Sequence, residues 1–335
     1  MIPNNYQGQL QKPLQSGFNA LSTTADVISG IDLSGKTAII TGGYAGIGLE
    51  TTKTLARAGA RIIVPARDIE KARQNLSGIP SVEIEYMDLS IAASIDEFAF
   101  KFLTSQRPLH LLINNAGIMW VPLRRDAKGF ESQLSTNHLG HFQLGARLFP
   151  ALASAGISRV ISVSSFGHQF AEFNFEDPNF NARDYETLSA YGQSKTANNL
   201  FAVELDKIGQ QHGIRAYSLH PGSVIGTDLG REAPASQFQQ MGWYDQNGHM
   251  KPELEAKFKT VEQGAATTVW CATSPLLQSI GGVYCQDCDI AELDNGIEHN
   301  YEEPWGLKGV KAYSLDGDNA QRLWKLSEEM TGTKF

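Results

Sequence analysis

Tyr191 and Lys195 form a pair of side chains that could move a proton. They lie four positions apart in a stretch with helical character that reaches to about Gln211, and residues at this spacing share one face of a helix. A phenol titrates at a pH of about 10, too high for a base at neutral pH. A neighbouring ammonium favours the phenolate and lowers the pKa of the phenol. The pair therefore predicts a general acid/base for a carbonyl or an alcohol.

Two serines, Ser164 and Ser165, close an apolar run upstream of this pair. If the run is a strand, both hydroxyls lie beyond its carboxyl end, where one of them could hydrogen-bond a substrate oxygen as charge develops on it. A tyrosine and a lysine at this spacing are also common as an exposed pair on any helix. The serines, and a glycine turn before them, make the catalytic interpretation more specific.

That glycine turn connects the first predicted strand, Thr37–Ile40, to a helical stretch. Its spacing is G-x-x-x-G-x-G, which differs from the common G-x-G-x-x-G fingerprint. Glycines at such a turn let the backbone approach a pyrophosphate, and the helix N-terminus offers unpaired N–H groups. The residues expected to bind the dinucleotide here are Gly42, Tyr44, Ala45, Gly46, Ile47 and Gly48.

An arginine follows the second predicted strand, where an NAD site usually has an acid. Ala66 occupies the position expected for that carboxylate, and Arg67 comes next. A guanidinium suits a 2′-phosphate, so NADP(H) is favoured over NAD(H). The alternative is that Arg67 pairs with Asp68 or Glu70, and that Asp68 faces the ribose instead.

The third and fourth predicted strands end in further candidates for the adenosine. Asp88 could accept a hydrogen bond from the adenine amino group, or it could cap the helix that begins near Ser90. The small and amide residues after the fourth strand can hold strand ends together and pass under the ribose. The cofactor residues expected from these two ends are Asp88, Leu89, Asn115, Ala116 and Gly117.

Short apolar, β-branched runs alternate with amphipathic helical stretches along the chain, which predicts a parallel sheet covered on both faces. We expect an α/β fold, a single Rossmann-type doubly wound domain over residues 33–335 with a seven-stranded parallel sheet, after an N-terminal extension at 1–32. The predicted strands are Thr37–Ile40, Arg61–Val64, Val82–Met87, Leu109–Asn114, Arg159–Ser164, Ala216–His220 and Gly282–Cys285.

Two long stretches, at about 166–187 and 223–259, interrupt this alternation and are candidates for substrate-covering segments. Simple surface insertions are the alternative. Aromatic and apolar residues near the site would suit a hydrophobic ketone or alcohol, although ordinary core packing explains each of them nearly as well. These residues are Ile118, Met119, Trp120, Val121, Phe166, His168, Phe170, Trp243 and Tyr244.

The composition excludes several other classes of protein. With 335 residues, a formal net charge of -8 and no long basic run, the chain is not expected to bind nucleic acid. It shows no signal peptide and no membrane span, so a cytoplasmic protein is expected. Cys285 and Cys288 could be a redox pair or half a zinc site, but no second ligand pair follows. We therefore expect no metal site, and we expect the two cysteines to lie at the end of a strand and in the turn that follows it.

Taken in order, these motifs resemble the short-chain dehydrogenase/reductase family, from about Leu33 to the C-terminus. Three stretches, Thr136–Phe142, Gly282–Cys288 and Ala320–Glu329, are similar to the branch that contains retinol dehydrogenases, the WW-domain oxidoreductase and protochlorophyllide reductase. The motifs that carry the family resemblance are Thr41–Gly48, Asn114–Gly117, Asn137-His138, Ser164-Ser165, Tyr191–Lys195 and Pro221-Gly222.

The resemblance implies a role for each matching residue. Tyr191 is the general acid/base, Lys195 lowers its pKa and binds the nicotinamide ribose, and Ser165 rather than Ser164 positions the substrate oxygen. Asn137 bends its helix to hold a water in a proton relay from Lys195 to solvent. The nicotinamide carboxamide is held by Pro221, Gly222 and Val224, with Thr227 beside it.

Three departures from the family pattern affect these assignments. Tyr44 and Ala45 replace the small polar residues usual in the glycine turn, and Gly226 is an extra residue before Thr227. About twenty-five residues separate Ser165 from the tyrosine, roughly double the commonest family spacing.

The leading hypothesis is an NADP(H)-dependent carbonyl reductase or alcohol dehydrogenase for a fairly apolar small molecule. One alternative is a Rossmann-type module that binds nicotinamide nucleotide and senses its redox state for a partner. Another is a reductase of a tetrapyrrole double bond. The resemblance is compatible with a homodimer or a homotetramer.

Overall fold

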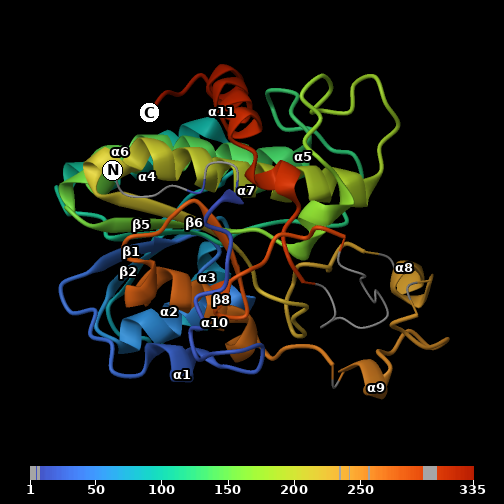
Figure 1. Ribbon diagram of the computed structural model, residues 1–335, viewed down its shortest axis with the longest axis horizontal. Coiled ribbons are helices and arrows are strands. Elements are labelled where there is room, and N and C mark those ends of the chain that lie inside the picture. The colour runs from blue at the N-terminus through green and yellow to red at the C-terminus, as the bar shows by residue number, and fades with distance from the viewer. Residues whose placement is uncertain (1–4, 6–7, 234, 241, 256, 297–307) are drawn as a thin grey trace.

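The computed structural model describes residues 5, 8–233, 235–240, 242–255, 257–296 and 308–335 (Figure 1). At its centre is an eight-stranded sheet in the order β3-β2-β1-β4-β5-β6-β7-β8. The strands are β1 (Thr37–Ile40), β2 (Arg61–Ala66), β3 (Val82–Tyr86), β4 (Leu111–Asn114), β5 (Ser158–Val163), β6 (Ile214–His220), β7 (Val283–Gln286) and β8 (Asp289–Ile290).

The seven predicted strands are confirmed, each within two residues of its predicted ends, and they pair in parallel. The eighth strand was not predicted. It is two residues long and runs antiparallel to β7 after a tight turn in which Asp287 and Cys288 have φ of 52° and 61°. This hairpin contains the C-x-x-C motif, whose cysteines are buried and free. A two-residue strand carries too little alternation to be read from sequence.

Helices cover both faces of the sheet (Figure 1). In chain order they are α1 (Thr24–Ile28), α2 (Gly46–Arg57), α3 (Ile69–Leu76), α4 (Ala92–Thr104), α5 (Ser132–Leu134), α6 (Gly140–Ser154), α7 (Thr187–Gly209), α8 (Ala235–Gln240), α9 (Pro252–Glu255), α10 (Val261–Thr273) and α11 (Gly317–Thr331). One apolar core lies between the sheet and α2, α3 and α10, and another lies between the sheet and α4, α6 and α7. Helix α11 packs on the outer side of α7.

The order of the strands indicates where a ligand would bind, at the carboxyl ends of β1 and β4. The chain builds β1, β2 and β3 outward in one direction and then returns to pair β4 with β1. Ligands of doubly wound sheets bind beyond the carboxyl ends of the strands at this reversal. The predicted glycine turn follows β1 and the predicted Asn115–Gly117 segment follows β4, so the two flank the reversal.

The N-terminal extension lies against β7 and β8, at the last strands of the sheet. The Gln11 side chain donates to the carbonyls of Tyr284 and Ala291 at 2.5 and 2.6 Å and accepts from the Tyr284 N–H at 3.1 Å. The backbone N–H groups of Leu14 and Ser16 donate to the Asp289 carboxylate. These contacts tie the N-terminal segment to β7 and β8 and give the Tyr284 N–H a partner at the edge of the sheet.

The longest helix, α7, has 23 residues and is buried along most of its length against the sheet and α11. Among the described residues, no helix combines the length and the apolar character needed to cross a membrane. Helix α7 instead carries polar side chains at its buried start, including Tyr191 and Lys195. Both of these side chains line the cavity described below.

Candidate active site

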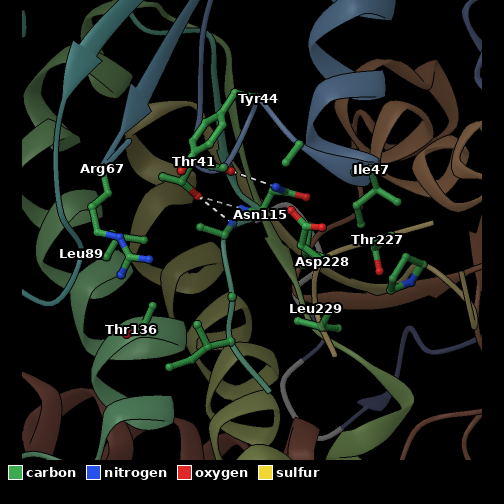
Figure 2. Close-up of a pocket in the computed structure, with 18 of the residues that line it drawn as sticks. Thr41, Tyr44, Ile47, Arg67, Leu89, Asn115, Thr136, Thr227, Asp228 and Leu229 are labelled. Atoms are coloured by element: carbon green, nitrogen blue, oxygen red, sulfur yellow. Dashed lines mark hydrogen bonds between the residues drawn. The ribbon is translucent and has the colours of Figure 1, made fainter. Parts of the chain in front are cut away.

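A cavity of about 460 Å³ opens where β1, β2, β4, β5 and β6 end. All of the predicted site residues line it except Gly48 and Asn137, which lie directly behind the lining. Figure 2 shows Tyr44, Arg67, Asn115 and Thr227, which come from four different segments, around the same space. The structure thus brings together residues that the sequence distributes over more than 180 positions, from Gly42 to Thr227.

The glycine turn forms a cradle at the start of α2. Gly42 and Gly46 have φ of 64° and 51°, which favours glycine. A Cβ on Gly48 would lie 2.4 Å from both the Gly42 carbonyl oxygen and the Asn115 Nδ2. No described side chain caps the N-terminus of α2, where Ala45 is the N-cap. Backbone N–H groups at an uncapped helix start fit a phosphate, so the turn fits the pyrophosphate of a dinucleotide.

Thr41 joins this turn to the neighbouring strand end, and sequence reasoning did not single it out. Its Oγ1 accepts from the N–H groups of Asn115 and Ala116 at 2.9 and 3.0 Å, as the dashed lines of Figure 2 show in part. It also lies 2.8 Å from His141 Nε2, and His141 Nδ1 lies 3.0 Å from the Asn137 carbonyl oxygen. Because a carbonyl only accepts, Nδ1 carries the proton and Nε2 accepts from the threonine hydroxyl.

Burial lowers the pKa of His141 to about 4, which keeps this imidazole neutral. The neutral ring links the glycine turn, through Thr41, to the backbone of Asn137. The only sequence signal for it was its place in the Thr136–Phe142 motif, where it had no assigned role.

At the end of the cavity beyond β2 and β3, Arg67 lies on the cavity wall beside Leu89 (Figure 2). The Asp68 carboxylate caps α3, and Glu70 forms an ion pair with Arg73 at 2.7 Å. Within the described part of the chain, no acidic side chain forms an ion pair with Arg67. Its guanidinium is therefore available to an anionic group in the cavity.

The segment after β6 closes this end of the cavity. Asp228 forms an ion pair with Lys71 of α3 at 2.7 Å, and both residues line the cavity. A Cβ on Gly46 would lie 3.4 Å from Thr227 Cγ2, so Thr227 lies against the glycine turn. Sequence reasoning missed Lys71 and Asp228 because their contact spans 157 positions.

Tyr191 and Lys195 lie side by side in the floor of the cavity, with relative exposures of 2% and 3%. Lys195 Nζ lies 5.5 Å from the centre of the tyrosine ring and donates to the Val163 carbonyl at 2.9 Å. Burial lowers the pKa of Lys195 to about 7. Burial also raises the pKa of Tyr191 to about 12, although its hydrogen bond with Ser165 acts in the opposite direction.

The pKa of Tyr191 is therefore raised, whereas the sequence predicted that Lys195 lowers it. A lysine with a pKa of about 7 carries only part of a positive charge at neutral pH, so its attraction for a phenolate is weak. The desolvation of the phenol then dominates. In this state Tyr191 holds its proton, which suits a proton donor.

The two serines have different surroundings. Ser164 is buried and donates to the Lys195 carbonyl oxygen at 2.9 Å. Both serines line the cavity, and the Ser165 Oγ accepts from the Gly167 N–H at 2.9 Å. The Ser165 hydroxyl thus lies next to both the cavity and the Tyr191 phenol.

Asn137 lies in a single π-helical turn, Ser135–Leu139, that interrupts the helical run between α5 and α6. Its side chain accepts from the Ile118 N–H at 2.9 Å and donates to the Ile118 carbonyl at 3.0 Å and to Ser194 Oγ at 2.9 Å. Gly117 separates it from Lys195, because a Cβ there would lie 3.3 Å from Asn137 Oδ1 and 3.5 Å from Lys195 Nζ. Asn137 thus supports the loop beside the lysine.

Of the candidate substrate residues, Ile118 lines the cavity, whereas Val121, Phe166 and His168 are buried outside its lining. The stretch at 166–187 contributes no lining residue and packs around α7 and α11. The stretch at 223–259 does contribute, through Val224, Thr227, Asp228, Leu229 and Arg231.

Four aromatic side chains meet beside the cavity. Phe238 lies 5.0 Å from Trp120, 6.1 Å from Trp243 and 4.9 Å from Tyr244, measured between ring centres. This cluster joins the loop after β4 to the segment after β6. It gives that side of the molecule an apolar character.

Comparison with known proteins matches residues 36–237 to the family described as short chain dehydrogenase. A "Probable oxidoreductase" of Streptomyces lividans is 40% identical over 301 residues, which are 88% of this chain and 97% of that protein. "Retinol dehydrogenase 11" of Homo sapiens is 35% identical over 331 residues, 97% of this chain and 92% of that protein. A crystal structure of an uncharacterized protein from Mycobacterium paratuberculosis has a TM-score of 0.70 and 31% identity, over 94% of this chain and 98% of that one.

Proposed function

The chain belongs to the short-chain dehydrogenase family of NAD(P)-dependent oxidoreductases, and from this premise we propose that it interconverts a carbonyl and an alcohol on a fairly apolar small molecule, using NADP(H). The observation that carries the proposal is the placement of Ser165, Tyr191 and Lys195 in one cavity with the glycine turn. The enzyme would need all four at once. A nucleotide-binding module would need only the turn.

The cofactor would lie along the cavity from Arg67 to Pro221. The N-terminus of α2 would hold the pyrophosphate, Lys195 the nicotinamide ribose, and the Pro221–Val224 loop the carboxamide. When bound, the nicotinamide supplies or accepts the hydride. Arg67 would bind the ribose 2′-phosphate. Its guanidinium has no acidic partner among the described side chains, and this supports NADP(H) as the cofactor.

In the reductive direction, the Tyr191 phenol would give its proton to the substrate oxygen as that oxygen becomes an alcohol. The raised pKa of the buried phenol supports this direction. The Ser165 hydroxyl would donate a hydrogen bond to the same oxygen while negative charge develops there. Lys195 would help restore the proton, since its pKa of about 7 lets it both gain and lose one near neutral pH.

The apolar character of the substrate is supported by Ile118 in the cavity wall and by the aromatic cluster beside it. The identity to proteins named as retinol dehydrogenases points to the same class of molecule. Asp228, which lines the opposite end, is already paired with Lys71.

The test is a panel of aldehydes, ketones and alcohols with both cofactors, run on the wild type and on Tyr191→Phe. We expect Tyr191→Phe to lose about 100- to 10,000-fold in kcat while the Kd for NADPH stays within about twofold. Tyr86→Phe, a matched change at an exposed edge-strand position, should leave both unchanged.

Substantial activity of Tyr191→Phe would exclude the mechanism. Tight binding of NADPH without turnover on the whole panel would favour the nucleotide-sensing module instead. An absorbance change coupled to a tetrapyrrole under illumination would favour reduction of a double bond.

A further inference from the structure

The turn Phe166–Phe170 follows Ser165 and lies directly on Tyr191. A Cβ on Gly167 would lie 2.6 Å from Tyr191 Cε1 and 3.3 Å from Ser165 Oγ. Gly192 is equally close, since a Cβ there would lie 2.8 Å from the Gly167 carbonyl oxygen. The position of this turn above the Tyr191 ring therefore sets the distance between the Ser165 hydroxyl and the Tyr191 phenol.

Two buried histidines hold the backbone on either side of the peptide bond that follows Ser165. His220, the last residue of β6, accepts from the Phe166 N–H through its Nδ1 at 3.0 Å. His168 Nδ1 lies 2.7 Å from the Ser165 carbonyl oxygen. Because a carbonyl only accepts, His168 carries its proton on Nδ1, whereas His220 must have Nδ1 unprotonated. One histidine donates and the other accepts at the same peptide group.

His168 is in turn held from the C-terminal part of the chain. Its Nε2 accepts from the Lys311 N–H at 3.2 Å, and its carbonyl oxygen accepts from Tyr313 Oη at 2.7 Å and from Thr196 Oγ1 at 3.1 Å. Lys311 and Tyr313 lie beyond residue 237, where the match to the family ends. The support of the turn is therefore built partly outside the family core.

Both imidazoles are neutral, as these hydrogen bonds require. Burial lowers the pKa of His220 to about 3 and that of His168 to about 4. The charged groups that bear on them are Lys259 for His220, and Lys311 and Asp294 for His168. Both lysines oppose a positive charge on the histidine that they face.

We propose that His220 and His168 are positioning residues that place the Ser165 hydroxyl against Tyr191 and the substrate oxygen. This inference rests on the proposed function, because it assigns the histidines an effect only through Ser165. Neither histidine lines the cavity, so neither is expected to touch substrate or cofactor. A displacement of about 1 Å at a reacting group can reduce a rate about 100-fold.

A double-mutant cycle between His220 and Ser165 tests the proposal. The variants are His220→Leu, Ser165→Ala and the double variant, compared by kcat on the best carbonyl substrate of the panel. We expect His220→Leu to reduce kcat on the order of 100-fold, but only about threefold or less in the Ser165→Ala background. Its Kd for NADPH should stay within about twofold, because the cofactor residues do not change.

His220→Asn is the conservative variant, since the asparagine Oδ1 can accept near the position of Nδ1. It should recover most of the loss. At the other histidine, His168→Asn can keep the donor to the Ser165 carbonyl, whereas His168→Gln can keep the acceptor for the Lys311 N–H. We expect the asparagine variant to be the more active of the two. These polar variants also provide the test if His220→Leu does not fold.

The matched control is His212→Asn at the far end of α7, which should leave kcat unchanged. Equal losses from His220→Leu with and without Ser165 would overturn the inference, because the histidine would then act on the enzyme generally. That result would leave the proposed function intact provided that Ser165→Ala is impaired. A wild type without turnover, or a fully active Ser165→Ala, would overturn the inference together with the proposed role of Ser165.

Discussion

The glycine turn (42–48) follows β1, and the turn 165–170, here called the serine turn, follows β5. In both turns a glycine leaves no room for a side chain, but the two turns are held together differently. In the glycine turn, Gly48 meets the carbonyl of Gly42, six residues earlier. In the serine turn, Gly167 meets the ring of Tyr191, which comes from α7. The first turn is folded partly against itself, with Asn115 Nδ2 equally close to Gly48, and the second is folded against another element.

The groups that support the two turns differ in the same way. The glycine turn depends mainly on its own glycines and on the neighbouring end of β4, through Thr41 and Asn115, and His141 of α6 contacts Thr41 from behind. The serine turn depends on β6 through His220, on α7 through Thr196, and on the C-terminal segment through Lys311. The candidate phosphate cradle thus depends more on local sequence than the serine turn does, because the contacts of the serine turn come from three separate elements.

Gly48→Ala should break the glycine turn and have the largest effect. Its Cβ would lie 2.4 Å from the Gly42 carbonyl oxygen and from Asn115 Nδ2, and neither can move without the turn. We expect the free energy of unfolding to fall by about 1–3 kcal/mol and NADPH binding to be lost. Denaturant titration and cofactor fluorescence measure the two effects. Gly145→Ala, where the nearest contact is 3.4 Å, is the control and should change neither.

Gly167→Ala should break the serine turn and spare the glycine turn. A Cβ 2.6 Å from the tyrosine ring must move Tyr191 or Ser165, so kcat should fall on the order of 100-fold. The Kd for NADPH should change by less than about threefold, because the pyrophosphate cradle is remote from the change. Loss of both functions together would mean that the two turns are not independent.

Arg67→Gln sharpens the comparison on the cofactor side, where one locally predicted residue has a defined effect. A hydrogen bond to a charged group contributes about 1.5–3 kcal/mol, so the ratio of kcat/KM for NADPH over NADH should fall about 10- to 100-fold. Lys12→Gln, in the N-terminal segment, is a charge-matched control and should leave the ratio unchanged. A wild-type ratio below one would contradict the assignment to NADP(H).

Acid should destabilise both turns gradually, because buried neutral histidines support both. The pKa values of His141, His168 and His220 lie at about 4, 4 and 3, below the ordinary value of 6.5, because burial disfavours the cation. Between pH 6.5 and about 4 the unfolded chain therefore binds more protons than the folded protein.

The free energy of unfolding should be highest above pH 6.5 and fall as the pH drops, by up to about 1.4 kcal/mol per pH unit for each histidine. Denaturant titrations at several pH values measure this slope. His141→Gln should reduce this slope by the contribution of one histidine. Replacement of the exposed His249 should leave the slope unchanged. A flat profile between these limits would contradict the burial of the three rings.

Local patterns in the sequence were sufficient for much of the fold. The strands were predicted because each is a short apolar run, and the glycine turn because its spacing directly follows β1. Strand β8 was missed because two residues carry no alternation. The chain positions of Tyr191 and Lys195 were read from helical spacing alone, and the structure places both in the cavity floor.

The surroundings of those two residues were not readable in the same way. The sequence predicted that Lys195 lowers the pKa of Tyr191. In the structure, burial raises the pKa of Tyr191 and lowers the pKa of Lys195. Burial depends on every element packed around a group, and no local spacing reports it. The stretch at 166–187 contributes no residue to the cavity lining and packs against α7 and α11, so its expected role in covering the substrate stays a prediction.

The sequence by itself determined which chemical groups are present and the turn that can hold a phosphate, because glycine freedom and helix periodicity act over a few residues. The tertiary structure alone decided which serine hydroxyl is bonded to the Lys195 carbonyl and which lies beside Tyr191, which protonation states are stable, and that His220 and His168 meet at one peptide group. Those outcomes depend on contacts between residues that are as many as 143 positions apart, and on the exclusion of water by the assembled core.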